Sequence, residues 1–192
     1  MKNRSAVLET AILGQLSSTP LHGYEIRKLL ALQLGPFRAF SYGTLYPALR
    51  SLAERGLISS TAPTKGPQAP LTRPGRNKII YQLTEQGNEL LHTVLSSAGP
   101  AAWEDDTFDV RFALFGQTDA DTRLRILEGR RIRLTERLAT LKESAARARE
   151  QLDEYSVELQ RHGLDTVDRE VRWLDGLITT ERARAEHASP NP

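Results

Sequence analysis

An apolar repeat with alternating spacings of three and four residues dominates the second half of this 192-residue chain. The repeat runs for about five heptads, and only Arg131 interrupts it. It predicts one long amphipathic helix, whose apolar seam cannot be buried within so small a domain without a partner. The members of the seam are Leu124, Leu127, Arg131, Leu134, Leu138, Leu141, Ala145, Ala148, Leu152, Tyr155 and Leu159.

The predicted long helix ends at His162-Gly163, and a returning helix starts at Asp165 or Thr166 with apolar residues in the same rhythm. The returning helix can cover part of the seam, and a second copy of the chain can cover the rest, which predicts a homodimer. The alternative is a monomeric two-helix hairpin. Arg131 is expected at a solvated position, because burying an unpaired charge is costly. We predict dimerisation through Leu124, Leu127, Leu134, Leu138, Leu141, Leu152 and Leu159.

The first half of the chain changes from a helical to an extended pattern. The pattern predicts helices over about residues 4–17, 21–34 and 42–55, and strands over 57–60 and 79–83. A fourth helix is predicted to begin after Thr84, its N-cap, and to stop before Gly99-Pro100. A short helix is expected over 106–115. The predicted fold is mostly α (α+β), with a winged helix-turn-helix domain over 1–98 and a helical, coiled-coil-like dimerisation domain over 99–192. Small α+β domains of other kinds also show this order of elements.

Charge and composition narrow the classes of function. Residues 1–92 hold 11 Lys/Arg and 5 Asp/Glu, so a polyanion would bind in the first half. The chain has no cysteine and no histidine pair at metal-ligand spacing, so no metal and no cofactor are expected. No phosphate-binding glycine motif or Ser/His/Asp grouping indicates an enzyme. Without a long apolar run or a signal-like start, we expect no membrane contact and a cytoplasmic protein.

The predicted helix over 42–55 has two different faces. Leu45, Ala48, Leu49 and Leu52 share one face, which is expected to point inward. The other face and the start of this helix are polar and aromatic, which is typical of a recognition helix that enters the major groove. Tyr42 and Tyr46 are equally compatible with simple packing at the surface or in the core. The residues on the other face and at its start are Ser41, Tyr42, Gly43, Thr44, Tyr46, Pro47 and Arg50.

Several short motifs, in order along residues 8–92, closely resemble the PadR family of bacterial transcriptional regulators. They are the segments Ile12–Leu16, Pro20–Ile26, Ser41–Leu49, Leu57-Ile58 and Tyr81–Gly87. The length and helical pattern of the second half resemble the larger PadR subfamily, whose members dimerise through a helical domain. The resemblance implies a homodimer that binds double-stranded DNA at an inverted-repeat operator, usually as a repressor that a small effector or another signal releases.

The resemblance also assigns contacts residue by residue. It implies that the major groove is contacted by Ser41, Tyr42, Thr44, Tyr46 and Pro47, and that Tyr24 and Lys28 lie near the DNA backbone. The helical pattern places Arg50 on the same face, so it is also expected to contact DNA. A wing between the strands would approach the minor groove through Arg76 and Lys78. The segment 61–77 departs from the family, because it is longer and richer in proline than the usual wing. His22 is expected to brace the turn before the second helix rather than to bind metal, and Gly23 to permit a close approach of the backbone.

Aromatic residues in the second half raise the possibility of a small-molecule site. Trp103, Phe108, Phe112 and Trp173, with Phe115, could line a cavity for a planar phenolic effector, or they could be ordinary core. Two other functions remain as alternatives. An architectural DNA binder would bind with little site preference and would need a larger basic excess. A protein-binding role through the long helix would make DNA binding secondary.

Overall fold

The computed structural model describes residues 2–35, 42–61, 79–148 and 153–188, which form parts of two compact units. The first unit comprises Met1–Ser97 together with Asp105–Gln117, and the second comprises Ala98–Glu104 together with Thr118–Pro192. The chain leaves the first unit one residue before the predicted boundary at 98/99. It then returns for residues 105–117, so the two units alternate along the sequence.

The first unit combines helices with a small antiparallel sheet in the order β1-β3-β2. β3 pairs with β2 from Ile58↔Leu83 to Thr61↔Ile80 and with β1 at Leu21↔Tyr81. The two-residue strand β1 was not predicted, because residues 21 and 22 were assigned to the following helix. The elements are α1 (Lys2–Leu16), β1 (Leu21–His22), α2 (Gly23–Leu34), α3 (Tyr42–Glu54), β2 (Ile58–Thr61), β3 (Ile80–Leu83), α4 (Glu85–Ser96), α5 (Phe108–Ala113) and the short helix η3 (Phe115–Gln117).

The core of the first unit forms where the apolar faces of α1, α2, α3 and α4 meet the sheet. α5 closes the same core with Val110, and Leu114, directly after α5, packs against Gly14 of α1. The helical periodicity therefore predicted the inward face of α3 correctly. Within this core, the residues with no exposed surface are Ile12, Ile26, Leu45, Leu49 and Leu52.

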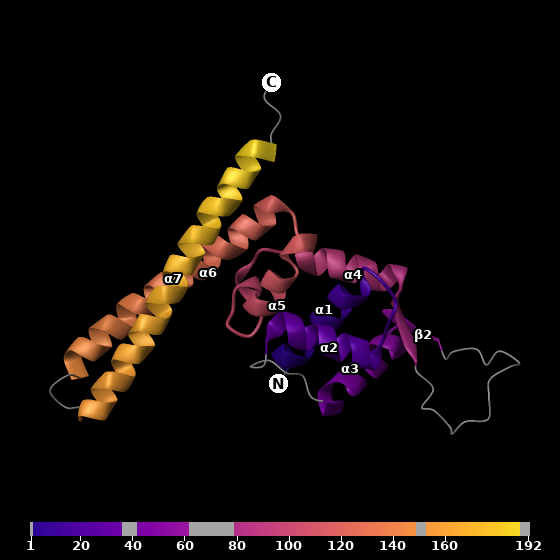
Figure 1. Cartoon of the computed structure of the whole chain (residues 1–192), viewed down its shortest axis with the longest axis horizontal. Coiled ribbons are helices and arrows are strands. Elements are labelled where there is room, and N and C mark those ends of the chain that lie inside the picture. The colour runs from indigo at the N-terminus through magenta and orange to yellow at the C-terminus, as the bar shows by residue number, and fades with distance from the viewer. Residues whose placement is uncertain (1, 36–41, 62–78, 149–152, 189–192) are drawn as a thin grey trace, which may run out of the picture. The chain divides into compact units, whose positions relative to one another are not determined.

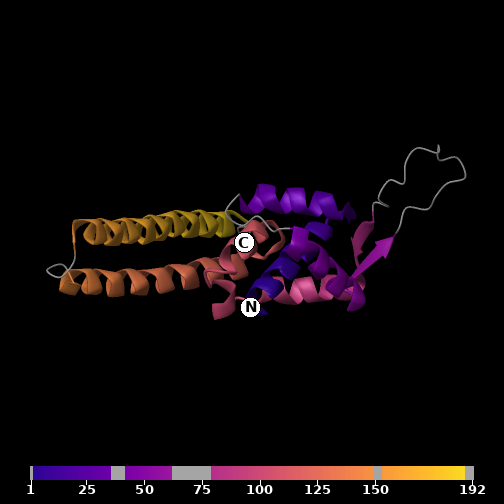
Figure 2. The same ribbon diagram turned by 90° about the horizontal axis from the view of Figure 1, so that it is seen from below.

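The second unit is an antiparallel pair of long helices, α6 (Ala120–Ala148) and α7 (Glu154–Ala188), with the short helix η2 (Pro100–Ala102). Figures 1 and 2 both show α6 and α7 side by side. Ion pairs between the two helices show that they are antiparallel, because the partner on α7 comes earlier in the sequence as the residue on α6 comes later. Examples are Arg123–Glu181 at 2.8 Å and Arg130–Glu170 at 2.8 Å. Within the described part of the chain, no helix is both long enough and apolar enough to cross a membrane.

The prediction of one helix from 124 to 162 was wrong. α6 ends at Ala148, and α7 begins at Glu154 and continues through His162-Gly163 without interruption. Asp153 starts the second helix, because its carboxylate accepts hydrogen bonds from the backbone N–H and the hydroxyl of Ser156, at 3.0 and 2.7 Å. This is the arrangement of an N-cap residue. The three-four spacing in the sequence continues from α6 into α7 and concealed the break between the two helices.

The reversal between α6 and α7 changes what covers the predicted dimer seam. Leu127 and Leu134 are fully buried and Leu138 is nearly so, because α6 packs along α7 of the same chain. Leu124 and Leu141 are half-buried, whereas Leu159 is 72% exposed. Leu152 lies outside the described residues. Arg131 is half-exposed and pairs with Asp175, in agreement with the expectation of a solvated position.

Candidate nucleic-acid interface

α3 presents one polar face to solvent on a rigid support. Its inward leucines are completely buried, while Thr44, Pro47 and Arg50 are exposed and Tyr46 is 40% exposed. Pro47 lies inside the helix, where it cannot donate the usual hydrogen bond to the carbonyl of Gly43. The buried stripe therefore fixes α3 in place and leaves its opposite face available for contact with another molecule.

The start of α2 lies beside the sheet and is held by its own capping interactions. The backbone N–H of His22 donates to a carboxylate oxygen of Glu25 at 2.8 Å, as in a capping box. The ring Nδ1 of His22 donates to the carbonyl of Ile79 at 3.2 Å. His22 thus braces the turn before α2, as expected. Tyr24 is 52% exposed, and Lys28 on the next turn of α2 is also exposed.

α2 and α3 meet where Tyr46 lies over Gly23. A Cβ added to Gly23 would come within 3.0 Å of the Tyr46 ring and 3.3 Å of its hydroxyl. Tyr81 of β3 lies near this contact. Burial raises the pKa of Tyr81, the neighbouring Tyr46 raises it further, and Arg50 lowers it. One aromatic and basic cluster therefore joins α2, α3 and the sheet.

Thr84 fixes the start of α4 against Leu57, the residue directly before β2. Its hydroxyl accepts from the backbone N–H of Gly87 at 3.0 Å and donates to the carbonyl of Leu57 at 2.9 Å. Gly87 lies so close to this carbonyl that an added Cβ would be 2.0 Å from it. The predicted cap is confirmed, and it holds the base of the β2-β3 hairpin to the helical core.

The structure brings the described candidates for DNA contact together on α2 and α3. Tyr24, Lys28, Thr44, Tyr46, Pro47 and Arg50 are all exposed on these two helices. Tyr42 begins α3, but its side chain lies outside the described residues, as do Ser41, Arg76 and Lys78. The predicted wing contacts through Arg76 and Lys78 stay predictions.

Sequence reasoning missed Tyr81 as a member of this cluster. The sequence pattern assigned Tyr81 only to a strand. Residues at alternate positions of a strand share one face, so Tyr81 and Leu83 could have been predicted to lie on the same face. Ile80, Tyr81, Gln82 and Leu83 form β3, and Tyr81 is 8% exposed. The sequence does show a tyrosine in a short strand that follows a predicted helix-turn-helix. That this tyrosine lies near Tyr46 could not be inferred without the fold.

The predicted effector residues divide between the two units. Phe108 is buried and lies 5.9 Å from Phe112 between ring centroids, and both belong to the first unit. Trp103 packs against Gly129 of α6 and Trp173 is 44% exposed on α7, both in the second unit. Neither unit by itself brings the four residues together.

The fold and the site define a class. A helix-turn-helix with an exposed third helix and an antiparallel hairpin is a winged helix-turn-helix, a fold whose recognition helix typically enters the major groove of DNA. Residues 12–93 match the model of the PadR-like family of transcriptional regulators. The resemblance found in the short motifs is confirmed for this part of the chain.

The similarity to individual proteins of known name covers only part of the sequence. The negative transcriptional regulator PadR of Bacillus subtilis (strain 168) is 33% identical over 86 residues, which are 45% of this chain and 43% of the relative. The match therefore spans less than half the length of that protein. The chain is also similar to a crystal structure of Bacillus subtilis PadR in complex with operator DNA, at 22% identity and a TM-score of 0.43, covering 91% of this chain and 99% of that one.

A further similarity is to the structure of the Vibrio cholerae virulence activator AphA, at 20% identity and a TM-score of 0.38, covering 92% of this chain and 99% of that one. Because both TM-scores lie below 0.5, the family assignment depends on the sequence match of residues 12–93.

Proposed function

We propose that this protein is a sequence-specific DNA-binding regulator that acts in the cytoplasm as a homodimer at an inverted-repeat operator, usually to repress transcription. The observation that carries the proposal is the rigid presentation of Thr44, Tyr46 and Arg50 on one exposed face of α3. Hydroxyl and guanidinium groups on such a helix face can reach base edges and phosphates. The family description and the name of the negative regulator from Bacillus subtilis support regulation by repression.

The proposal is tested by selecting DNA fragments with the purified protein and measuring the affinity for the selected sequence and for random DNA. Replacing Tyr46 or Thr44 with alanine should weaken binding to the selected sequence by about 1–3 kcal/mol, with a much smaller loss on random DNA. The matched control is Thr93→Ala, an exposed threonine of α4 that bonds only within its own helix. Equal losses on both DNAs would assign a positioning role to these residues, and unchanged binding would contradict the recognition helix.

Dimerisation, in our proposal, uses an exposed apolar stripe of α7 in place of most of the predicted seam. Tyr155, Leu159 and Trp173 are 86%, 72% and 44% exposed, and Leu177 is half-buried. Trp173 follows Tyr155 by about five turns, so the stripe stays on one side of the helix.

The spacing of this stripe favours a second copy of the same helix as its partner. Tyr155 and Leu159 precede Thr166 by the same intervals at which Leu177 and Trp173 follow it. An antiparallel pair of α7 helices with its two-fold axis at Thr166 would therefore place each apolar residue opposite another. A self-complementary patch of this kind is what a two-fold dimer requires.

We also propose that a small aromatic effector releases the protein from DNA. The support for this proposal is that each unit carries aromatic side chains of its own, Phe108 and Phe112 in the first and Trp103 and Trp173 in the second, and flat apolar rings of this kind suit a planar phenolic ligand. Trp103 and Trp173 are the two tryptophans of the chain, so their fluorescence reports directly on such binding. Titration with phenolic acids should quench the fluorescence and weaken DNA binding over the same concentration range. Quenching without loss of DNA binding would contradict release.

A further inference from the structure

Gly23 and Tyr46 are in closer contact than any other residue at position 23 would permit. The distances from an ideal Cβ at position 23 to Cε1, Oη and Cζ of Tyr46 are 3.0, 3.3 and 3.4 Å. Contacts this short require the neighbour to move by some tenths of an ångström. Tyr46 is 40% exposed, so its ring has room to move outward.

Backbone conformation does not explain the glycine. The described glycines with positive φ are Gly35 and Gly56, and Gly23 is not among them. Its position at the first residue of α2 suits alanine as well as glycine, and alanine is the better helix former. The remaining reason for a glycine at position 23 is the space that the Tyr46 ring occupies.

The surface on which the ring lies is itself fixed by three elements. β1 pairs with β3 at Leu21↔Tyr81, and His22 bonds to both Glu25 and Ile79. Gly23 directly follows these residues, so its position is set by the sheet and by the start of α2. The ring of Tyr46, although carried by α3, is positioned by contacts outside α3.

We propose that Gly23 is a positioning residue for DNA readout: its missing side chain seats the Tyr46 ring at the orientation in which that residue reads its base. The inference depends on the proposed function and adds a specificity-determining residue that makes no side-chain contact with DNA. A methyl group at position 23 pushes the ring outward while leaving the fold intact. Stability and site preference should therefore change independently.

The test uses the full-length protein and the DNA sequence that it selects. Gly23→Ala should melt at the same temperature as the wild type or higher, because alanine favours the helix. Its affinity for the selected DNA should fall about tenfold, while its affinity for random DNA of the same length stays unchanged. The matched control is Gly176→Ala in α7, where an added Cβ meets nothing within 4 Å.

A double-mutant cycle identifies Tyr46 as the residue through which Gly23 acts. In a Tyr46→Ala background, Gly23→Ala should cause no further loss of affinity, because there is no ring left to displace. Losses that add together would overturn the proposal, and so would wild-type affinity of Gly23→Ala for the selected DNA.

A measurement without DNA separates this inference from the proposed function. The protein is labelled with fluorotyrosine, and the Tyr46 resonance is assigned by its absence in Tyr46→Phe. Gly23→Ala should shift that ¹⁹F resonance, and an unchanged resonance would overturn the inference. A wild-type protein that selects no DNA sequence would instead refute the proposed function, and the resonance would still report whether Gly23 positions the ring.

Discussion

Arg111 is a buried charge whose partners are backbone carbonyls. Its side chain, on α5, is 2% exposed, and its guanidinium donates to the carbonyls of Val94, Leu95 and Ser97 at the end of α4. The last carbonyls of a helix have no partner within the helix, and a cation there also interacts favourably with the helix dipole. Burial lowers the pKa of Arg111, and a guanidinium nevertheless stays protonated.

We expect Arg111→Met to reduce the free energy of unfolding by about 2 kcal/mol or more, because it removes the guanidinium donor from the carbonyls of Leu95 and Ser97. The carbonyl of Val94 keeps Ser97 as a donor. Urea denaturation followed by circular dichroism measures the change. Arg125→Met is the control, since Arg125 is exposed and bonds only to a carbonyl of its own helix. Equal stability of the two variants would show that water replaces the guanidinium at the end of α4.

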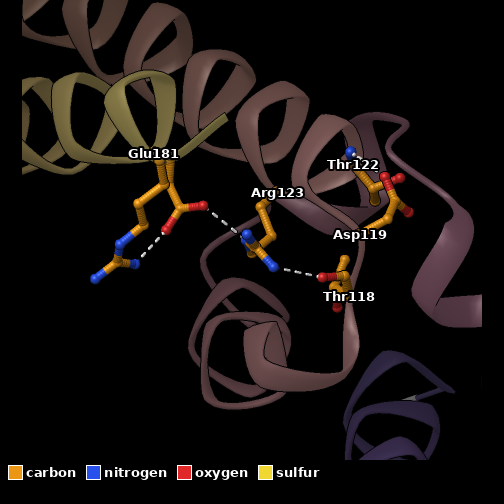
Figure 3. A network of polar contacts seen from close by, with 6 residues as sticks. Thr118, Asp119, Thr122, Arg123 and Glu181 are labelled. Carbon is orange, nitrogen blue, oxygen red and sulfur yellow. Dashed lines mark hydrogen bonds and ion pairs between the residues drawn. The ribbon is translucent and has the colours of Figure 1, made fainter. Parts of the chain in front are cut away.

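At the scale of elements, two aspartates start the long helices of the second unit. Asp119 accepts from the backbone N–H of Thr122 at 2.8 Å, and this bond lowers the pKa of its carboxyl. Hydrogen bonds from Ser156 lower the pKa of Asp153 in the same way. Figure 3 shows the start of α6, where Arg123 also lies between Glu181 and the Thr118 carbonyl.

These caps predict a loss of helix stability in acid. Because the folded state lowers both pKa values, the stabilisation is present above about pH 4 and is lost as the pH falls through the lowered values. The thermal midpoint, followed by circular dichroism, should therefore fall steeply in this range. The double variant Asp119→Asn/Asp153→Asn should show a flatter dependence, and Asp165→Asn within α7 is the control. An unchanged pH profile in the double variant would contradict the assignment of the caps.

The α6-α7 pair gives a second prediction for elements. Leu134 is 1% exposed, so Leu134→Ala should lower the free energy of unfolding by about 2–5 kcal/mol. Ile132, two residues earlier, is 55% exposed, and Ile132→Ala should change it by no more than about 0.5 kcal/mol. Chemical denaturation of both variants measures the difference. Similar costs would mean that Ile132 is also covered by a partner.

The sequence predicted elements better than it predicted their partners. Periodicity placed α1, α3 and α4 to within about two residues and identified the buried face of α3 through Leu45 and Leu49. It failed at residues 149–153, because the heptad spacing continues from α6 into α7 and Asp153 resembles any other polar residue of a helix. The closeness of Tyr46 and Tyr81 comes from tertiary packing between helix and sheet, which no local pattern contains.

At the scale of the whole molecule, the proposed α7 stripe predicts the assembly state. Light scattering at micromolar concentration should give twice the monomer mass of 21.5 kDa. Leu159→Glu combined with Trp173→Glu should give monomers with unchanged helix content, because both side chains are exposed in the single chain. Loss of helix content would show that these residues stabilise the chain itself. A monomeric wild type would refute dimerisation, and a dimeric double variant would refute this interface.

The charge distribution predicts how DNA binding depends on salt. Lys28 is exposed on α2, beside the face that carries Tyr24. If it neutralises one phosphate, Lys28→Ala should lower the slope of log affinity against log salt by about one and weaken binding to selected and random DNA alike. Lys142→Ala on α6 should leave the slope unchanged. The same measurement applies to Arg76 and Lys78, and an unchanged slope would exclude each residue from the DNA backbone.

The interleaved course of the chain limits how such a protein can change during evolution. Residues 105–117 complete the core of the first unit, although they follow the point where the chain first enters the second. A gene fusion at Gly99 would give the new protein a first unit without Val110 and Leu114, and with no Arg111 at the end of α4. Recombination between relatives should therefore succeed only beyond Gln117, so that α5 is inherited together with α3.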